Sequence, residues 1–118
     1  MNFSDPNLLG ALDAAQASGL DALPFGIIGM GPTGEVEVYN DMEARLAGLA
    51  RDSVLGRHLF TAVAPCMNNF MVAQRFEDEA VIDDVIDYVL TFRMRPARVR
   101  LRLLKAPGAK RRYVLIQR

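Results

Sequence analysis

The run Val85-Ile86-Asp87-Tyr88-Val89-Leu90-Thr91-Phe92-Arg93-Met94 alternates between two kinds of side chain with a period of two. Successive side chains of a β-strand point to opposite faces, so this run predicts a long strand. The same period returns where Val99, Leu101 and Leu103 alternate with arginines, and residues 113–116 form a last apolar run. Turn residues at 95–97 and 106–109 separate the three runs, which therefore predict three sequential antiparallel strands.

A β-hairpin is predicted earlier, over residues 24–39. The apolar run Phe25–Met30 is followed by the turn Gly31-Pro32-Thr33-Gly34, in which Pro32 takes the second position and Gly34 can adopt a positive φ. Val36 and Val38 then alternate with glutamates up to Tyr39. We expect these two strands and the three later ones to form one five-stranded antiparallel sheet.

Short helices are predicted between and before the strands. Residues 7–16 predict a helix that Asn7 caps and that ends at Ser18-Gly19. Asn40 followed by Glu43 is a capping box for a helix that runs to Leu49 and is interrupted at Gly48. A short helix over 51–56 and the longest one over 69–82 follow, the latter with an apolar face of Phe70, Ala73, Phe76 and Ala80.

This order of elements predicts the α+β class, in which short helices cover one face of an antiparallel sheet. We expect residues 1–22 to form an N-terminal helical cap and residues 23–118 to form the main domain. The chain of 118 residues carries 14 basic and 14 acidic side chains. This balance favours neither nucleic acid nor an anionic membrane as a partner, and no apolar run is long enough to span a bilayer.

The arginines Arg98, Arg100 and Arg102 should project from one face of their strand. A basic stripe can bind phosphates, but it can also be the solvated face of a sheet, paired with acidic residues across strands. No aromatic side chains interleave with it, so the solvated face is the favoured interpretation and an acidic protein is a better partner than nucleic acid.

Cys66 is the only cysteine and His58 the only histidine. One cysteine excludes an internal disulfide, which favours a reducing compartment such as the cytoplasm. No second ligand joins either residue at a metal-binding spacing, so we expect no metal site and read His58 as a surface residue. A lone cysteine is most often a small buried hydrophobic residue, and Cys66 needs further residues to become a site.

Tyr39 and Glu43 lie four positions apart across a predicted strand-to-helix junction. A phenol and a carboxyl so placed can be aimed at one point. The alternative is that Tyr39 is an ordinary strand aromatic and that Glu43 serves the capping box. Spacing alone leaves both interpretations open.

Tyr39-Asn40-x-x-Glu43 and Val63-Ala64-Pro65-Cys66, with the cysteine 27 positions after the tyrosine, together resemble the photoactive yellow proteins. These are bacterial blue-light receptors of the PAS fold. The resemblance covers most of residues 20–118 and includes the segments Leu20–Gly26, Val54–Arg57, Leu59-Phe60, Asp87-Tyr88 and Met94-x-Pro96-x-x-Val99.

The resemblance implies a p-coumaric acid chromophore held as a thioester on Cys66. Its phenolate oxygen would accept hydrogen bonds from Tyr39 and from a protonated Glu43, and the Cys66 N–H would hold the thioester carbonyl. Blue light would isomerise the chromophore from trans to cis, and Glu43 would then lose its proton. The implied chromophore pocket also includes Ala47, Leu49, Leu59, Val63, Ala64, Pro65, Leu90, Phe92 and Met94.

These residue types suit that chemistry. Two short bonds to a charged oxygen offset the cost of burying a phenolate, and burial beside an anion keeps a carboxyl neutral. After proton transfer, an uncompensated buried charge would cost roughly several kcal/mol. A domain's whole stability is only about 5–15 kcal/mol, so we expect partial unfolding as the signal, beginning with the N-terminal helix.

The chain departs from the family's usual pattern near this site. Ala47 stands where a threonine is common, Leu49 where an arginine is common, and Tyr113-Val114 where Tyr-Trp is usual. The run Met67–Gln74 is also unlike the family. These departures predict a changed colour and recovery rate, or a site that binds a different ligand or none.

Two other functions therefore stay open. One is a PAS sensory or dimerisation module that binds another small molecule, with His58 or Cys66 as the ligand if that molecule is haem. The other is a small enzyme or carrier with Cys66 as nucleophile, for which His58 is the only histidine base on offer. We expect a non-enzymatic receptor, a monomer or weak homodimer, that signals to a separate partner protein.

Overall fold

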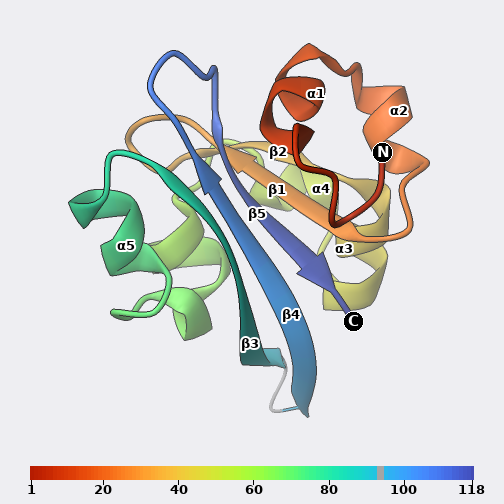
Figure 1. The fold of residues 1–118 in the computed structure, drawn as a ribbon. Coiled ribbons are helices and arrows are strands. Elements are labelled where there is room, and N and C mark those ends of the chain that lie inside the picture. The colour runs from red at the N-terminus through yellow and green to blue at the C-terminus, as the bar shows by residue number, and fades with distance from the viewer. Residues whose placement is uncertain (93–94) are drawn as a thin grey trace.

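The sheet has five antiparallel strands in the described part of the chain, in the order β2-β1-β5-β4-β3 (Figure 1). The structure is a computed structural model that describes residues 1–92 and 95–118, without the side chain of Phe92. The strands are β1 Gly26–Met30, β2 Val36–Tyr39, β3 Ile82–Phe92, β4 Arg95–Lys105 and β5 Arg112–Gln117. The predicted α+β class with a five-stranded antiparallel sheet is confirmed.

The helices are short and lie before and between the strands. The α-helices are α1 Leu8–Ala14, α2 Ala17–Asp21, α3 Asp41–Ala47, α4 Arg51–Val54 and α5 Ala73–Asp78. A π-helical turn, η1 Leu59–Val63, and a 3-10 turn, η2 Pro65–Met67, lead to the cysteine. The hairpin turn is as predicted, because Gly34 has a φ of 93° and its N–H donates to the Gly31 carbonyl at 3.0 Å.

Each face of the sheet carries its own hydrophobic core. Ile28, Leu90, Leu101 and Ile116 belong to the cluster that packs against η1, η2 and α5, and we refer to their side as the inner face. Neighbouring residues in the same strands, such as Ile27 and Leu104, belong to a second cluster with α1 and α2 on the outer face. The period of two therefore separates two cores.

The N-terminal segment covers only part of the outer face (Figure 1). Arg102 is 4% exposed there. Its guanidinium donates to the carbonyls of Phe3 and Asp5 at 2.9 and 2.7 Å and pairs with Asp83 at 2.9 Å. Arg98 and Arg100 share this face but are exposed. The expectation of one solvated arginine stripe is thus wrong at Arg102, which anchors the N-terminal segment. Whether residues 1–22 form a separate unit stays a prediction.

Two element boundaries differ from the prediction. Ser18 and Gly19 do not end the first helical region but lie within α2, where the burial of Leu20 outweighs the low helix propensity of glycine. The second is the predicted turn over 95–97, which is wrong because Pro96 lies in β4 opposite Thr91. At Pro96, β4 pairs with β3 alone, since its pairing with β5 begins at Arg100. Proline is tolerated where one side of a strand has no partner.

The longest predicted helix, over 69–82, is also wrong in extent. Only Ala73–Asp78 is helical, Phe70 is 79% exposed, and Ala80 is exposed as well. The Asn69 side chain explains the late start, because its oxygen accepts from the Met71 N–H at 3.0 Å and its amide is bonded elsewhere. Residues 69–72 therefore form a turn, and Phe70 points away from the core.

We predict that Arg102→Ala loosens the N-terminal segment. The variant loses charge-assisted bonds to two carbonyls and an ion pair, which we expect to cost about 1.5–3 kcal/mol of unfolding free energy. Hydrogen exchange should show faster exchange of the amides of residues 2–21. Arg100→Ala is the matched control on the same strand face. Equal exchange in both variants would contradict the anchoring role.

Candidate functional site

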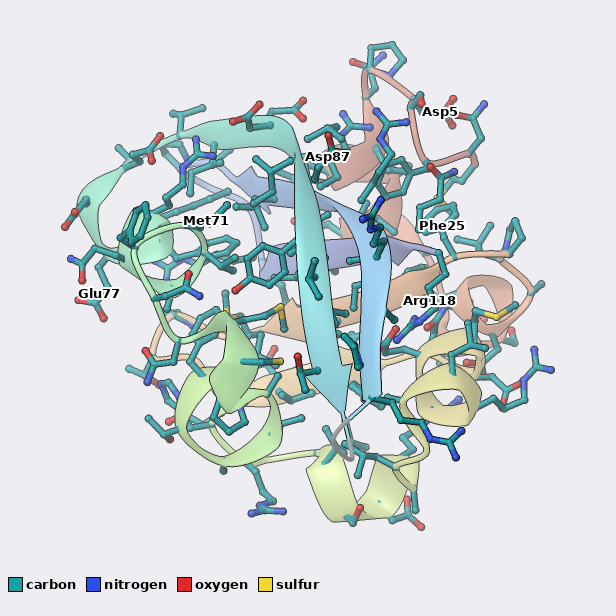
Figure 2. All side chains as sticks on the ribbon, turned by 90° about the horizontal axis from the view of Figure 1, so that it is seen from below. Asp5, Phe25, Met71, Glu77, Asp87 and Arg118 are labelled. Atoms are coloured by element: carbon teal, nitrogen blue, oxygen red, sulfur yellow. The ribbon has the colours of Figure 1, made fainter. Side chains whose placement is uncertain are left out.

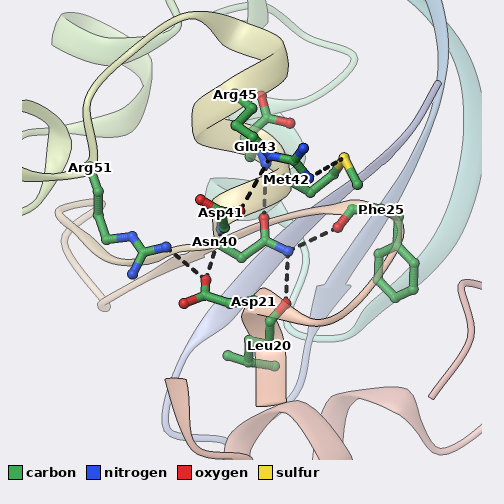
Figure 3. Close-up of polar contacts among 9 residues, drawn as sticks. All are labelled: Leu20, Asp21, Phe25, Asn40, Asp41, Met42, Glu43, Arg45 and Arg51. Carbon is green, nitrogen blue, oxygen red and sulfur yellow. Dashed lines mark hydrogen bonds and ion pairs between the residues drawn. The ribbon is translucent and has the colours of Figure 1, made fainter. Parts of the chain in front are cut away.

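Asn40 holds the junction between β2 and α3. Its side-chain oxygen accepts from the N–H groups of Ile27 and Glu43 at 2.9 and 3.1 Å. Its amide donates to the carbonyls of Leu20 and Phe25 at 3.0 and 2.9 Å (Figure 3). This buried amide therefore joins α3 to β1 and to the end of α2, and it fixes the residues on either side of it.

The predicted capping box is only half formed. Asn40 accepts from the Glu43 N–H as expected, but its own N–H donates to the Ile27 carbonyl at 3.1 Å. The Glu43 carboxylate therefore does not reach back to the helix start. Capping does not explain the position of this carboxylate.

Glu43 forms a buried ion pair with Arg118. The two guanidinium nitrogens lie 2.7 and 3.3 Å from the two carboxylate oxygens. Glu43 is 0% exposed and the Arg118 side chain 20% exposed. Arg118 follows Ile116 by two residues at the end of β5, so it points to the same inner face, next to α3 (Figure 2).

The Tyr39 hydroxyl interacts electrostatically with both members of this ion pair. Tyr39 is buried at the end of β2, and burial together with the charge of Glu43 raises the pKa of its phenol well above the ordinary value. Burial likewise raises the pKa of the Glu43 carboxyl, while the bonds and charge of Arg118 oppose that shift. The structure thus brings Tyr39 and Glu43 together, and it adds a cation to them.

Gly26 provides the space for the Glu43 carboxylate. A Cβ atom built on Gly26 would overlap the Glu43 Oε1 atom and lie 3.1 Å from its Cδ. Gly26 pairs with Ile116 in the β1–β5 ladder, which places Glu43 beside the strand that carries Arg118. A larger side chain at this position would push the carboxylate away from its partner.

Cys66 lies in the 3-10 turn η2, partly buried against the inner core cluster to which Tyr39 belongs. Its carbonyl accepts from the Tyr88 hydroxyl at 2.6 Å and from the Asn69 amide at 3.3 Å. The Asn69 amide also donates to the Tyr88 hydroxyl at 2.6 Å. Strand β3 and the turn after η2 therefore fix the peptide that carries the cysteine.

A cavity of about 1060 Å³ opens between the partners of Cys66 and the partner of Glu43. Its lining includes Asn69 and Tyr88, which bond the Cys66 carbonyl, and Arg118, which bonds Glu43. Exposed residues of β3 and β4, among them Arg98 and Arg100, line it as well. The cavity is thus open to solvent and is lined both by the partners of Cys66 and by the partner of Glu43.

The other predicted pocket residues are placed as follows. Leu59, Val63, Ala64 and Leu90 are buried in the inner cluster, Leu49 packs against it, and Ala47 is buried in α3. Pro65 is exposed. Met94 and the side chain of Phe92 lie outside the described residues. The chromophore contacts of all these residues, and of Tyr39, Glu43 and Cys66, stay predictions.

His58 is not a plain surface residue. It is half-buried, and its Nδ1 accepts from the N–H groups of Phe60 and Thr61 at 3.2 and 3.3 Å, which caps η1. A cap that uses this ring nitrogen does not favour His58 as a catalytic base. In residues 1–92 and 95–118, no group of three histidine, cysteine, aspartate or glutamate residues could hold a metal ion.

Three residues of this region were not found from the sequence. Arg118 has no role in the sequence-based expectations, although its period-two offset from Ile116 assigns it to the inner face. Tyr88 was placed on the correct face without a partner for its hydroxyl. The helix predicted over 69–82 includes Asn69, and no local pattern predicts its bond to the Tyr88 hydroxyl.

Comparison with solved structures defines the class of the fold. The PAS domain of an HTR-like protein from Haloarcula marismortui superposes with a TM-score of 0.65 at 16% identity, over 95% of this chain and 96% of that one. The chain therefore has the PAS fold. In the described residues, no helix has the length and apolar character needed to cross a membrane.

A closer likeness defines the family. The photoactive yellow protein domain of the sensor histidine kinase Ppr from Rhodospirillum centenum is 34% identical, with a TM-score of 0.84 over 93% of this chain and 99% of that one. The photoactive yellow protein of Rhodothalassium salexigens is 25% identical over 121 aligned positions, which span 100% of this chain and 97% of that one. No protein-family model matches the chain. The chain belongs to the photoactive yellow protein family, as a divergent member, and is a photoreceptor-like or PAS sensory domain.

The raised pKa of Glu43 predicts a pH-dependent stability. Above the ordinary carboxyl pKa of 4.5, the folded state holds a proton that the unfolded state has lost. Rising pH therefore lowers the unfolding free energy until it passes the folded-state pKa. Denaturant unfolding from about pH 4 to about pH 8 should show this decline in the wild-type minus Glu43→Gln difference in unfolding free energy. A wild-type minus variant difference that is independent of pH would refute the assignment.

Gly26→Ala should destabilise the fold by about 1–3 kcal/mol, because the new methyl group overlaps the Glu43 carboxylate. In a Glu43→Ala background the same change should cost less, since the overlapping atoms are gone. Gly10→Ala is the control, because its position in α1 is open and alanine there should add about 0.5–1 kcal/mol. Denaturant titrations of the wild type, the two Gly→Ala variants, Glu43→Ala and the double variant measure these costs. An equal cost of Gly26→Ala in both backgrounds would disprove the contact.

Proposed function

We propose that the chain is a blue-light receptor that carries p-coumaric acid as a thioester on Cys66. The observation that supports this most is the buried group of Tyr39, Glu43 and Arg118 on the inner face. Tyr39 belongs to the same core cluster against which Cys66 packs. Family membership supports the same function.

The residues fit such a ligand. When bound, the chromophore supplies light absorption and the isomerisation of a double bond. A negatively charged phenolic oxygen in a buried site needs hydrogen-bond donors. Tyr39 and Glu43 can supply two, and Arg118 adds a positive charge nearby.

Tyr39 and Glu43 have different roles toward the phenolate oxygen in this proposal. The pKa of Tyr39 is far above neutral, so its hydroxyl keeps its proton and serves as a permanent donor. The pKa of Glu43 is raised by burial and lowered by Arg118, so its proton can be held or released. We infer that Glu43 donates to the phenolate oxygen in the dark and passes its proton to that oxygen after illumination.

Cys66 is the attachment point in this proposal. Its thiol sulfur forms the thioester bond, and its N–H holds the thioester carbonyl. Tyr88 and Asn69 bond the Cys66 carbonyl and so fix the orientation of the residue. The cavity lined by Asn69, Tyr88 and Arg118 brings solvent to residues that bond Cys66 and Glu43.

We infer that the signal reaches the N-terminal segment through α3. Asn40 at the start of α3 donates to the Leu20 carbonyl of α2, and the Asp41 N–H donates to Asp21 at 2.8 Å (Figure 3). A charge left on Glu43 perturbs α3 and thereby these bonds. A loosened cap would be read by a separate partner protein in the cytoplasm, and the receptor itself would be non-enzymatic and monomeric or weakly dimeric.

A second candidate is a PAS sensory module for another small anionic ligand. The cation at Arg118 and the apolar Leu49 in place of the family's arginine favour it. Such a ligand would need no thioester, so the role of Cys66 separates the two candidates.

The test is loading with an activated coumaroyl ester. We expect a yellow protein whose mass rises by one coumaroyl group and whose colour bleaches under blue light. Cys66→Ala should stay colourless, because it lacks the sulfur that forms the thioester. Absorption spectra and intact-protein mass measure both results.

The control for folding is the circular dichroism spectrum of Cys66→Ala. A wild type that stays colourless and unmodified refutes the proposed receptor. Colour that persists in Cys66→Ala after removal of free ester supports the second candidate. In loaded protein, Glu43→Gln should shift the absorption band to longer wavelength, since its amide is a weaker donor to the phenolate.

A further inference from the structure

Arg118 occupies the position on Glu43 that a ligand would need. Its guanidinium contacts both carboxylate oxygens, at 2.7 and 3.3 Å. A carboxyl group that donates its proton to a ligand cannot also accept two such bonds as a carboxylate. Glu43 can therefore either form the ion pair with Arg118 or donate a proton to a ligand, but it cannot do both at once.

The position of Arg118 allows it to leave. It lies just past the end of β5 at Gln117, its side chain is partly exposed, and it lines the cavity that opens to solvent. Glu43 has no such freedom, because it is fully buried and its helix start is held by Asn40. A movement that separates the pair is thus a movement of Arg118.

We propose that Arg118 is a positioning residue that exchanges with the ligand's phenolate oxygen on Glu43. This inference rests on the proposed function. In the dark, with Glu43 protonated and bonded to the phenolate, Arg118 lies in the cavity. After light, the Glu43 proton moves to the phenolate oxygen, and Arg118 returns to the carboxylate. Arg118 thereby compensates the negative charge of Glu43, and this lengthens the lifetime of the light state.

Among the residues that the structure describes, the charged and titratable groups facing Glu43 from the elements around it are Tyr39 and Arg118. Tyr39 stays neutral, so it cannot compensate a carboxylate. Leu49, at the position where the family commonly has an arginine, carries no charge. Within residues 1–92 and 95–118, the compensating charge therefore comes from Arg118, just past the end of β5.

The first measurement uses chromophore-free protein. Infrared or carbon-13 spectra should show Glu43 ionised at neutral pH in the wild type and protonated in Arg118→Leu, because an unpaired buried carboxyl holds its proton. Arg118→Lys should restore the ionised form. Arg100→Leu is the matched control, since Arg100 lines the same cavity without contacting Glu43. An unchanged Glu43 signal in Arg118→Leu overturns the proposal.

The second measurement is dark recovery of loaded protein after a flash. Arg118→Leu should recover faster than the wild type by on the order of tenfold or more, since the light state loses a charge-assisted bond. Arg118→Lys should lie between them, and Arg100→Leu should match the wild type. Loaded protein that recovers equally in all variants overturns the exchange. Protein that takes up no coumaroyl group instead refutes the proposed function.

Discussion

The side-chain amide of Asn40 is the constraint on which the arrangement of this domain depends. It is buried, and each of its four hydrogen bonds goes to a different residue: Ile27, Glu43, Leu20 and Phe25. An unsatisfied amide at this depth would cost about 1–3 kcal/mol for each lost partner. The strand β1, the end of α2 and the start of α3 must therefore meet at this point, which sets the positions of the flanking residues Tyr39 and Glu43.

A buried carboxylate beside this junction is an expensive feature, and the fold compensates it from three directions. Gly26 leaves room for the oxygens, β5 delivers Arg118, and Asn40 fixes the helix start. Breaking a buried pair on one side typically costs about 3–5 kcal/mol, whereas replacing both partners by apolar residues is often neutral. Stability alone thus does not require the pair. The presence of the pair fits a site in which Glu43 gives up a proton and gains a negative charge.

The sheet could be predicted because burial imposes a period of two that survives in the sequence. Ile86, Tyr88 and Leu90 fall on the inner face as expected, and the turn at Gly34 follows from its required φ. The extent of the helix predicted over 69–82 could not be predicted, because the Asn69 side chain bonds Tyr88, 19 positions along the chain, and stops a helical pattern that is locally acceptable. In the same way, the Glu43–Arg118 pair joins residues 75 positions apart, so no local spacing reveals it.

The bonds of the N-terminal segment show where a disturbance of α3 would be felt. Arg102 bonds the carbonyls of Phe3 and Asp5, and the Tyr113 hydroxyl bonds Asp13 at 2.8 Å, so the segment before α1 and α1 itself are tied to β4 and β5. Asn40 and Asp41 tie only the end of α2 to the start of α3. These two groups of bonds share no residue. A shift of α3 therefore acts on α2 directly, while α1 keeps its own anchors to the sheet. Since Asp21 is also paired with Arg51 of α4 at 2.7 Å, release of the cap should begin at Leu20.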